Sequence, residues 1–172
     1  MNKRCDKFER VARDFYPTPM AAVLPLLPHL AIGTRFIEPC AGDGALFLRL
    51  EENGMHCPLA YDIAPQSDDI GTADALVDDL LCGLGGHVDF FITNPPWNRK
   101  TLHPLIKRLS DTLPTWLLFD ADWMHTKQSA PYMPRLRKVV SVGRVKWIPD
   151  SKMTGKDNCA WHLFDKPSDM PT

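Results

Sequence analysis

Four consecutive residues, Asn94-Pro95-Pro96-Trp97, follow an apolar run and have the types needed to hold an amino group on a flat ring. Each proline fixes its φ near about −65° and favours an extended conformation at the residue before it, so the segment is stiff. The Asn94 side-chain oxygen and the Pro95 carbonyl can both accept hydrogen bonds from one NH2 group, with Pro96 as rigid backing. The Trp97 ring offers a stacking surface, and two acceptors would free the nitrogen lone pair for reaction. The alternative is a Pro-Pro turn that merely ends a strand.

The tetrad resembles the catalytic motif of amino methyltransferases that use S-adenosylmethionine (SAM), above all the DNA N6-adenine enzymes, in which Asn or Asp precedes Pro-Pro and an aromatic residue. The resemblance implies that Asn94, Pro95, Pro96 and Trp97 are catalytic and that Asn94 also borders the cofactor. Asn at the first position points to adenine N6 over cytosine N4, where Ser is usual. The same motif occurs in enzymes that act on RNA bases or on a protein glutamine, so these substrates stay open. A SAM-binding or nucleic-acid-binding protein without turnover is a third hypothesis.

A glycine loop and two later acids complete the resemblance. Residues 38–44, Glu-Pro-Cys-Ala-Gly-Asp-Gly, are similar to the family's cofactor loop, in which glycines let the backbone approach the amino-acid end of SAM and an acid receives its ammonium group. Asp62 follows about twenty residues later, where an acid accepts hydrogen bonds from ribose hydroxyls. Asp74 matches the acid that meets the adenine amino group of SAM, although other aspartates crowd it. The alternatives are a tight strand-helix turn for the loop, and a helix N-cap or a surface acid for Asp62.

Residues 14–19, Asp-Phe-Tyr-Pro-Thr-Pro, resemble a Tyr-x-Thr-Pro segment that folds over the cofactor in many adenine enzymes. Thr18 can bond the SAM carboxylate, and Phe15 or Tyr16 can cover the ligand. The segment can instead, or at the same time, be a helix start, because Thr followed by Pro is a good N-cap pair. The expected cofactor-binding residues are Phe15, Tyr16, Thr18, Glu38, Pro39, Ala41, Gly42, Gly44, Asp62, Ile63, Asp74, Ala75 and Asn94.

Strand-like and helix-like apolar segments alternate along the chain, which indicates an α/β fold. The expected helices are 45–50 and 101–113, and the expected strands are 35–40, 59–63, 88–93, 115–119 and a final antiparallel pair, 139–148 and 160–164. Together with the resemblance, this series predicts a Rossmann-like class I SAM methyltransferase fold. Its sheet is expected to be mostly parallel and seven-stranded, with an antiparallel last strand and helices on both faces.

The length of 172 residues suits one domain, residues 1–172, with its core at about 14–165 and no separate target recognition domain. No apolar run approaches the ~20 residues of a membrane span, and the polar N-terminus does not resemble a secretory signal. We therefore expect a cytoplasmic protein, in the host cytoplasm if phage-encoded, without a membrane partner. The five cysteines form no Cys-x-x-Cys pair and the six histidines show no ligand spacing, so we predict no metal, and Cys40 is expected to be a packing residue.

Charge divides the chain into an acidic and a basic part. Residues 36–92 hold eleven acidic residues against one basic, whereas residues 97–156 hold twelve basic residues against four acidic. The basic part begins at the tetrad and favours a polyanionic partner over a merely solvated face. The free loops are expected at 98–103, 122–134 and 149–158, and their phosphate-binding candidates are Arg99, Lys100, Lys127, Lys152 and Lys156.

These loops leave little chain for reading bases, so we predict a short or relaxed target preference, with single strands or RNA as open alternatives to duplex DNA. The compact layout and the segments 142–147 and 160–164 resemble small phage or prophage adenine methyltransferases. That likeness implies a role in protecting DNA from host restriction-modification systems. Both a monomer and a homodimer are compatible with the sequence.

Overall fold

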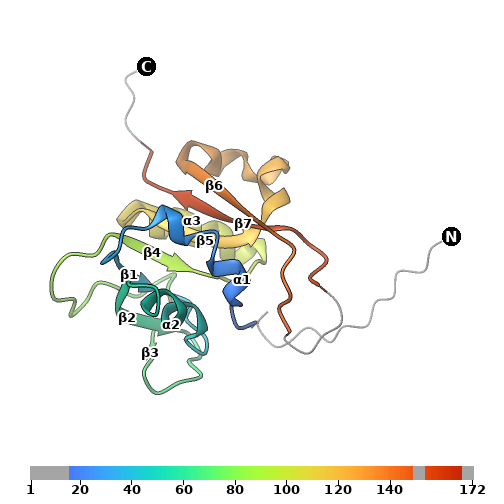
Figure 1. Ribbon diagram of the computed structural model, residues 1–172. Coiled ribbons are helices and arrows are strands. Elements are labelled where there is room, and N and C mark those ends of the chain that lie inside the picture. Colours follow the sequence, from blue (N-terminus) through green and yellow to red (C-terminus); the bar gives the residue numbers. More distant parts are fainter. Residues whose placement is uncertain (1–15, 149–153, 168–172) are drawn as a thin grey trace.

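A seven-stranded sheet forms the centre of the computed structural model, which describes residues 16–148 and 154–167 (Figure 1). Its order is β3-β2-β1-β4-β5-β7-β6. The strands are β1 (Arg35–Glu38), β2 (His56–Asp62), β3 (Gly71–Thr72), β4 (Phe90–Thr93), β5 (Thr115–Asp120), β6 (Leu136–Gly143) and β7 (Cys159–Phe164). The first five strands are parallel to one another, whereas β7 runs antiparallel to both β5 and β6. The predicted fold class is confirmed.

Helices cover both faces of this sheet. They are α1 (Met20–Val23), η2 (Leu27–His29), α2 (Ala45–Glu51), α3 (Arg99–Thr112), η3 (Ala121–His125) and η4 (Lys127–Arg135), where η marks a 3-10 helix. Successive strand residues point to opposite faces, so Ile92 and Leu118 join a core with α1 and α2, whereas Phe91 and Leu117 join a second core with α3 and η3. The carboxyl ends of β1, β2, β3 and β4 meet at one edge of the sheet, and the tetrad follows β4 there.

The final hairpin differs from the prediction. The sequence indicated a strand over 139–148, but β6 starts at Leu136 and ends at Gly143. Gly143 has a φ of 86°, which turns the chain out of the sheet, and Val145 is buried in the core beside α1 and α2. The backbone N–H of Gly155 donates to the Val145 carbonyl at 2.8 Å. Residues 144–148 therefore belong to the connection between β6 and β7.

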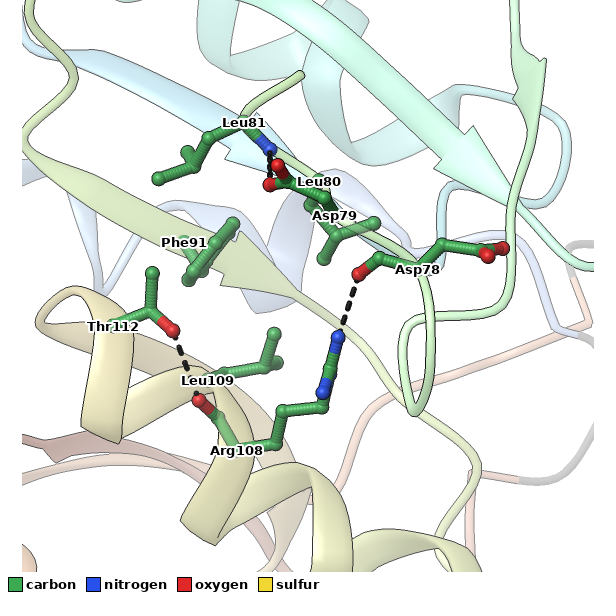
Figure 2. A pocket seen from close by; sticks show the side chains of 8 residues that line it. All are labelled: Asp78, Asp79, Leu80, Leu81, Phe91, Arg108, Leu109 and Thr112. Atoms are coloured by element: carbon green, nitrogen blue, oxygen red, sulfur yellow. Dashed lines mark hydrogen bonds between the residues drawn. The ribbon is translucent and has the colours of Figure 1, made fainter.

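The helix after the tetrad starts earlier than predicted. Asn98 is its N-cap, and the Asn98 side chain accepts a hydrogen bond from the Thr101 backbone N–H at 3.0 Å. Between this helix and residues 78–81 lies a pocket of about 160 Å³, where Arg108 donates to the Asp78 carbonyl at 2.7 Å (Figure 2). The pocket holds none of the predicted site residues, and it is smaller than the ~300 Å³ of typical ligand sites.

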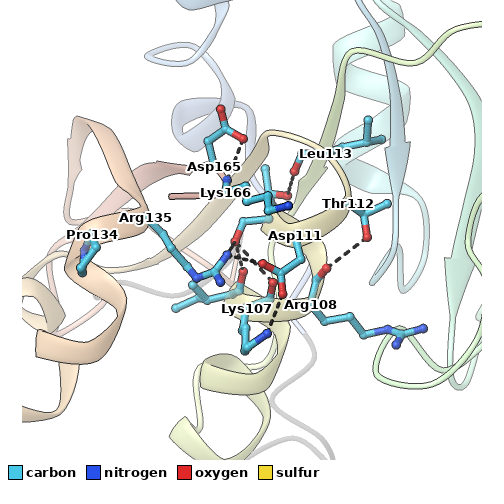
Figure 3. A network of polar contacts seen from close by, with 12 residues as sticks. Lys107, Arg108, Asp111, Thr112, Leu113, Pro134, Arg135, Asp165 and Lys166 are labelled. Atoms are coloured by element: carbon cyan, nitrogen blue, oxygen red, sulfur yellow. Dashed lines mark hydrogen bonds and ion pairs between the residues drawn. The ribbon is translucent and has the colours of Figure 1, made fainter. Parts of the chain in front are cut away.

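A polar network anchors η4 and the start of β6 to the end of α3 (Figure 3). Arg135 lies 3.0 Å from the Ser110 hydroxyl and 2.6 Å from the Asp111 carboxylate, and Lys107 lies 2.6 Å from the other Asp111 oxygen. The two cations lower the pKa of Asp111, chiefly through the hydrogen bond from Lys107. The segment between β5 and β6 is thus fixed to α3.

Candidate active site

Asn94 connects the tetrad to the beginning of the described chain. Its Nδ2 donates to the Thr18 hydroxyl at 3.2 Å, and its Oδ1 accepts from the Trp97 indole N–H, also at 3.2 Å. Thr18 is buried. The predicted helix start is confirmed, because α1 begins at Met20, but its N-cap is Pro19 without a side-chain cap, so Thr18 does not cap the helix. Two segments that are far apart in sequence therefore meet at the predicted catalytic amide.

Trp97 is half-buried and packs against a residue that the sequence analysis did not select. The Trp97 and Trp147 rings meet edge to face, with 5.7 Å between centroids and 84° between planes. A Cβ atom on Gly155 would lie 3.1 Å from the Trp147 ring, so Gly155 permits close packing there. Trp147 was missed because residues 139–148 were assigned to a strand; its signal was an aromatic residue within the basic part of the chain.

The glycine loop between β1 and α2 is pinned to the end of β2. The Gly42 N–H donates to Asp62 Oδ2 at 2.9 Å, and the Ala64 N–H donates to Asp62 Oδ1 at 2.8 Å. Gly42 and Gly44 have φ values of 58° and 86°, and a Cβ on Gly44 would lie 2.7 Å from the Phe47 ring. Asp62 is thus neither a helix N-cap nor a free surface acid, because it holds the loop in place. The loop is also the strand-helix turn that the sequence left as an alternative.

Glu38 is a buried acid beneath this loop. It is 1% exposed, and its Oε2 accepts a hydrogen bond from the Phe47 N–H at 3.0 Å. Burial raises the Glu38 pKa well above its ordinary value, and the charges of Asp43 and Asp62 raise it further, against the lowering effect of the Phe47 hydrogen bond. A cation bound near the three acids would relieve their mutual repulsion.

Asp74 lies just after β3, next to Asp62. The Ala73 N–H donates to the Asp62 carbonyl at 3.1 Å, and Asp74 Oδ1 accepts from the Leu76 N–H at 2.9 Å. Ile63 is 58% exposed, whereas Ala75 is buried. This end of the site therefore combines carboxylates with exposed apolar surface.

The remaining predicted residues occupy the surroundings. Pro39, Ala41 and Pro95 are buried, while Tyr16 and Pro96 are half-buried. Phe15 and Lys152 lie outside the described residues.

The basic candidates Arg99, Lys100, Lys127 and Lys156 are all exposed. Their placement differs from the prediction, because residues 99–103 belong to α3, and residues 122–134 lie largely in η3 and η4. Arg99 contacts the side chain of Gln128, the neighbour of Lys127, so Arg99, Lys100 and Lys127 lie near the first turn of α3.

An aromatic cluster holds η3 and η4 against α3. The Trp123 indole N–H donates to His103 Nε2 at 3.0 Å, and the Tyr132 ring lies 4.6 Å from the His103 ring. Burial, together with the charge of Arg99, lowers the pKa of His103. The surface that carries Arg99 and Lys127 is therefore supported by fixed side chains from three helices.

Within residues 16–148 and 154–167, no group of three or more His, Cys, Asp or Glu side chains is arranged to hold a metal ion. No helix in that part of the chain is long and apolar enough to cross a membrane. Cys40, beside the glycine loop, is a free thiol whose pKa is raised by burial, which disfavours the reactive thiolate.

No protein-family model and no curated protein matches the chain. Solved structures do match its fold. A proposed RNA methyltransferase from Pyrococcus horikoshii has a TM-score of 0.60 at 14% identity, over 88% of this chain and 86% of that one. A dimethyladenosine transferase from Plasmodium falciparum has a TM-score of 0.52 at 14% identity, over 88% and 62%. The methyltransferase subunit of a type I restriction-modification system from Streptococcus thermophilus has a TM-score of 0.53 at 11% identity, over 90% and 45%.

These likenesses, at such low identity, concern the fold. Together with the strand order and the reversed β7, they show that the chain has the Rossmann-like class I methyltransferase fold.

Proposed function

We propose that this protein transfers a methyl group from SAM to the N6 amino group of adenine in DNA, with a short or relaxed target preference. The observation that carries the proposal is the position of Asn94 at the carboxyl edge of the sheet. There it is bonded to Thr18 and Trp97 and follows the strand next to β1, which leads into the glycine loop. In this proposal one reaction uses the tetrad, the glycine loop, Asp62 at the end of β2 and Asp74 after β3.

The donor set fits SAM. Glu38 and the backbone of Gly42 and Gly44 would receive the amino-acid end, where the buried acid complements an ammonium group. Asp62 would accept from the ribose hydroxyls and Asp74 from the adenine amino group. Further contacts would come from Phe15, Tyr16, Thr18, Pro39, Ala41, Ile63, Ala75 and Asn94. When bound, the cofactor supplies an electrophilic methyl group.

The tetrad positions the target nitrogen. Asn94 Oδ1 and the Pro95 carbonyl accept one amino hydrogen each, which directs the nitrogen lone pair out of the base ring toward the incoming methyl group. Pro96 keeps the two acceptors rigid, and Trp97 forms a wall of the base pocket. The amino proton leaves after transfer, so a strong general base is not required.

A nucleic-acid substrate is supported by the exposed cations around the tetrad. Arg99, Lys100, Lys127 and Lys156 suit phosphate contacts, which give affinity without sequence information. The preference for DNA adenine rests on Asn94 as the first residue of the tetrad. A phage origin, protection from restriction and a monomeric or homodimeric state remain part of the proposal.

The test is methyl transfer from labelled SAM to duplex DNA, single-stranded DNA and RNA, followed by digestion to nucleosides and mass spectrometry. N6-methyladenine from DNA is expected, and Asn94→Ala should abolish it. Asn53→Ala is the control, because it also removes a half-buried carboxamide, which donates to the Arg49 carbonyl but lies after α2. Label in RNA alone would change the substrate, and a protein that binds SAM yet labels no nucleic acid would refute the proposal.

A further inference from the structure

The hydrogen bonds of Asn94 define which way its amide faces. An indole N–H can only donate, so the Asn94 atom that meets Trp97 Nε1 at 3.2 Å must be the oxygen. The amide nitrogen then faces the Thr18 hydroxyl, which accepts at 3.2 Å. If the amide were flipped, the Asn94 NH2 group would face the Trp97 indole N–H. Both groups are donors, so the hydrogen bond between Asn94 and Trp97 would be lost.

From this geometry we infer that Trp97 is a positioning residue for Asn94, acting through its indole N–H together with the Thr18 hydroxyl. The inference rests on the proposed function and deepens it, because it gives Trp97 a second role, the orientation of Asn94, besides that of a wall of the base pocket. A carboxamide has nearly the same shape after a half-turn, so packing alone discriminates poorly between its two orientations. The flipped form would present NH2 to the amino group of the target, and two donors would then face each other.

The same bond limits what Asn94 can accept. The Asn94 oxygen has two lone pairs, and Trp97 engages one of them. One acceptor position remains for the target, so its second amino hydrogen must go to the Pro95 carbonyl. A primary amino group satisfies both acceptors, whereas a ring nitrogen with one hydrogen would leave one acceptor unpaired.

The position of the Trp97 ring is fixed from two directions. Pro95 and Pro96 restrict the backbone between Trp97 and Asn94, and Trp147 packs edge to face against the ring. Trp147 is in turn held near Gly155, where a Cβ atom would approach to 3.1 Å. Phe at position 97 would preserve an aromatic surface but carry no donor, and the hydroxyl of Tyr would lie at the far end of its ring. Among Phe, Tyr and Trp, only Trp supplies this bond.

The kinetic test compares kcat and KM on an adenine-containing DNA oligonucleotide for Trp97→Phe, Thr18→Val, Thr18→Ser and the double variant Thr18→Val/Trp97→Phe. Trp97→Phe should lower kcat about tenfold with little change in KM for DNA. Thr18→Ser should recover most of what Thr18→Val loses. The fold-decrease in kcat of the double variant should be smaller than the product of the two single fold-decreases, because Thr18 and Trp97 both orient the Asn94 amide.

Trp161→Phe is the matched control, since it removes an indole hydrogen bond, to the Ala22 carbonyl at 2.7 Å, in which no residue of the tetrad takes part. It should lower stability and leave the kcat of the folded protein near the wild-type value. A Trp97→Phe variant with normal kcat and a raised KM, or strictly additive losses, would overturn the inference and leave Trp97 as a stacking surface.

A measurement without turnover separates this inference from the proposed function. The chain has five tryptophans, and the indole N–H signal of Trp97 can be identified in a 15N–1H spectrum by its loss in Trp97→Phe. This signal should move upfield in Asn94→Ala, which removes the acceptor, and downfield in Asn94→Asp, which charges it. An unmoved signal in both variants would overturn the inference, whereas shifted signals with no methylation of any nucleic acid would overturn the proposed function alone.

Discussion

Replacing Glu38 with Gln should stabilise the protein at neutral pH while weakening cofactor binding. Glu38 is 1% exposed, and burial raises its pKa well above the ordinary 4.5. The folded state therefore binds more protons than the unfolded state at pH values between 4.5 and the raised pKa. Across that window the unfolding free energy falls as pH rises, with a limiting slope of about 1.4 kcal/mol per pH unit, and it levels off above the raised pKa.

Glu38→Gln removes this loss but retains the shape of the side chain and an acceptor for the Phe47 N–H, which donates to Glu38 at 3.0 Å. The two proteins should have similar unfolding free energies near pH 4, where Glu38 is protonated in both states. The variant should then become the more stable one as pH rises. Urea unfolding followed by tryptophan fluorescence between pH 4 and 8 measures the difference.

Cofactor binding should respond in the opposite direction. The SAM ammonium favours ionised Glu38, so binding should release a proton, and affinity should increase as pH rises through the raised pKa. Glu38→Gln should weaken SAM binding about ten- to hundredfold and abolish the proton release, which calorimetry in buffers of different ionisation enthalpy detects. A variant that is less stable than wild type at every pH, or that binds SAM equally well, would refute this account of Glu38.

Two further substitutions test the core and the glycine loop. His162 is fully buried and stacks on Phe119 at 4.0 Å. Against the lowering effect of burial, the nearby Leu117 and Ala160 backbones raise its pKa, but among the described residues neither ring nitrogen has a hydrogen bond of good geometry. His162→Phe should therefore raise the unfolding free energy by about 1–3 kcal/mol. Because burial lowers the His162 pKa to about 4, the advantage should grow as pH falls from 6.5 toward 4, and a destabilised variant in urea unfolding would contradict it. Gly44→Ala places a Cβ 2.7 Å from the Phe47 ring at a φ of 86°, so it should cost about 1 kcal/mol or more and weaken SAM binding in calorimetry; unchanged values would show that the loop can adjust.

Most of the sheet could be predicted from the sequence because most of its strands contain short apolar runs separated by glycine, proline and acidic turns. The exception is β3, whose two exposed residues carry no such pattern. Each run also had a fixed place relative to a motif, so a mostly parallel sheet with a reversed last strand followed once the fold class was recognised. The failure at 139–148 has a local cause. Valines continue to alternate with other residues as far as Val145, which is typical of a strand. Gly143, however, takes a positive φ, and Val145 is directed into a different part of the core.

The residues to which the proposed function assigns a role could also be selected from the sequence, since Asn94, Asp62 and Glu38 occupy motif positions. Their partners could not be predicted. Asp62 is expected to meet a ribose, and the bonds that the structure shows for its carboxylate come from the Gly42 and Ala64 N–H groups. Such bonds depend on how the ends of β1 and β2 are aligned, which residue types alone do not specify.

The contact between Thr18 and Asn94 shows what the topology adds to the motifs. Thr18 comes before the first strand and Asn94 after β4, so they meet only when β4 pairs with β1 and the segment before α1 crosses the carboxyl edge of the sheet. Residues 16–18, which are expected to cover the cofactor, thus also fix the Asn94 amide, which is expected to hold the target. Ordering of residues 16–18 by the cofactor would then stabilise the Asn94 orientation that the target needs. The two substrates would bind with positive coupling, and Thr18→Val should reduce that coupling in a two-ligand binding titration with SAM and DNA.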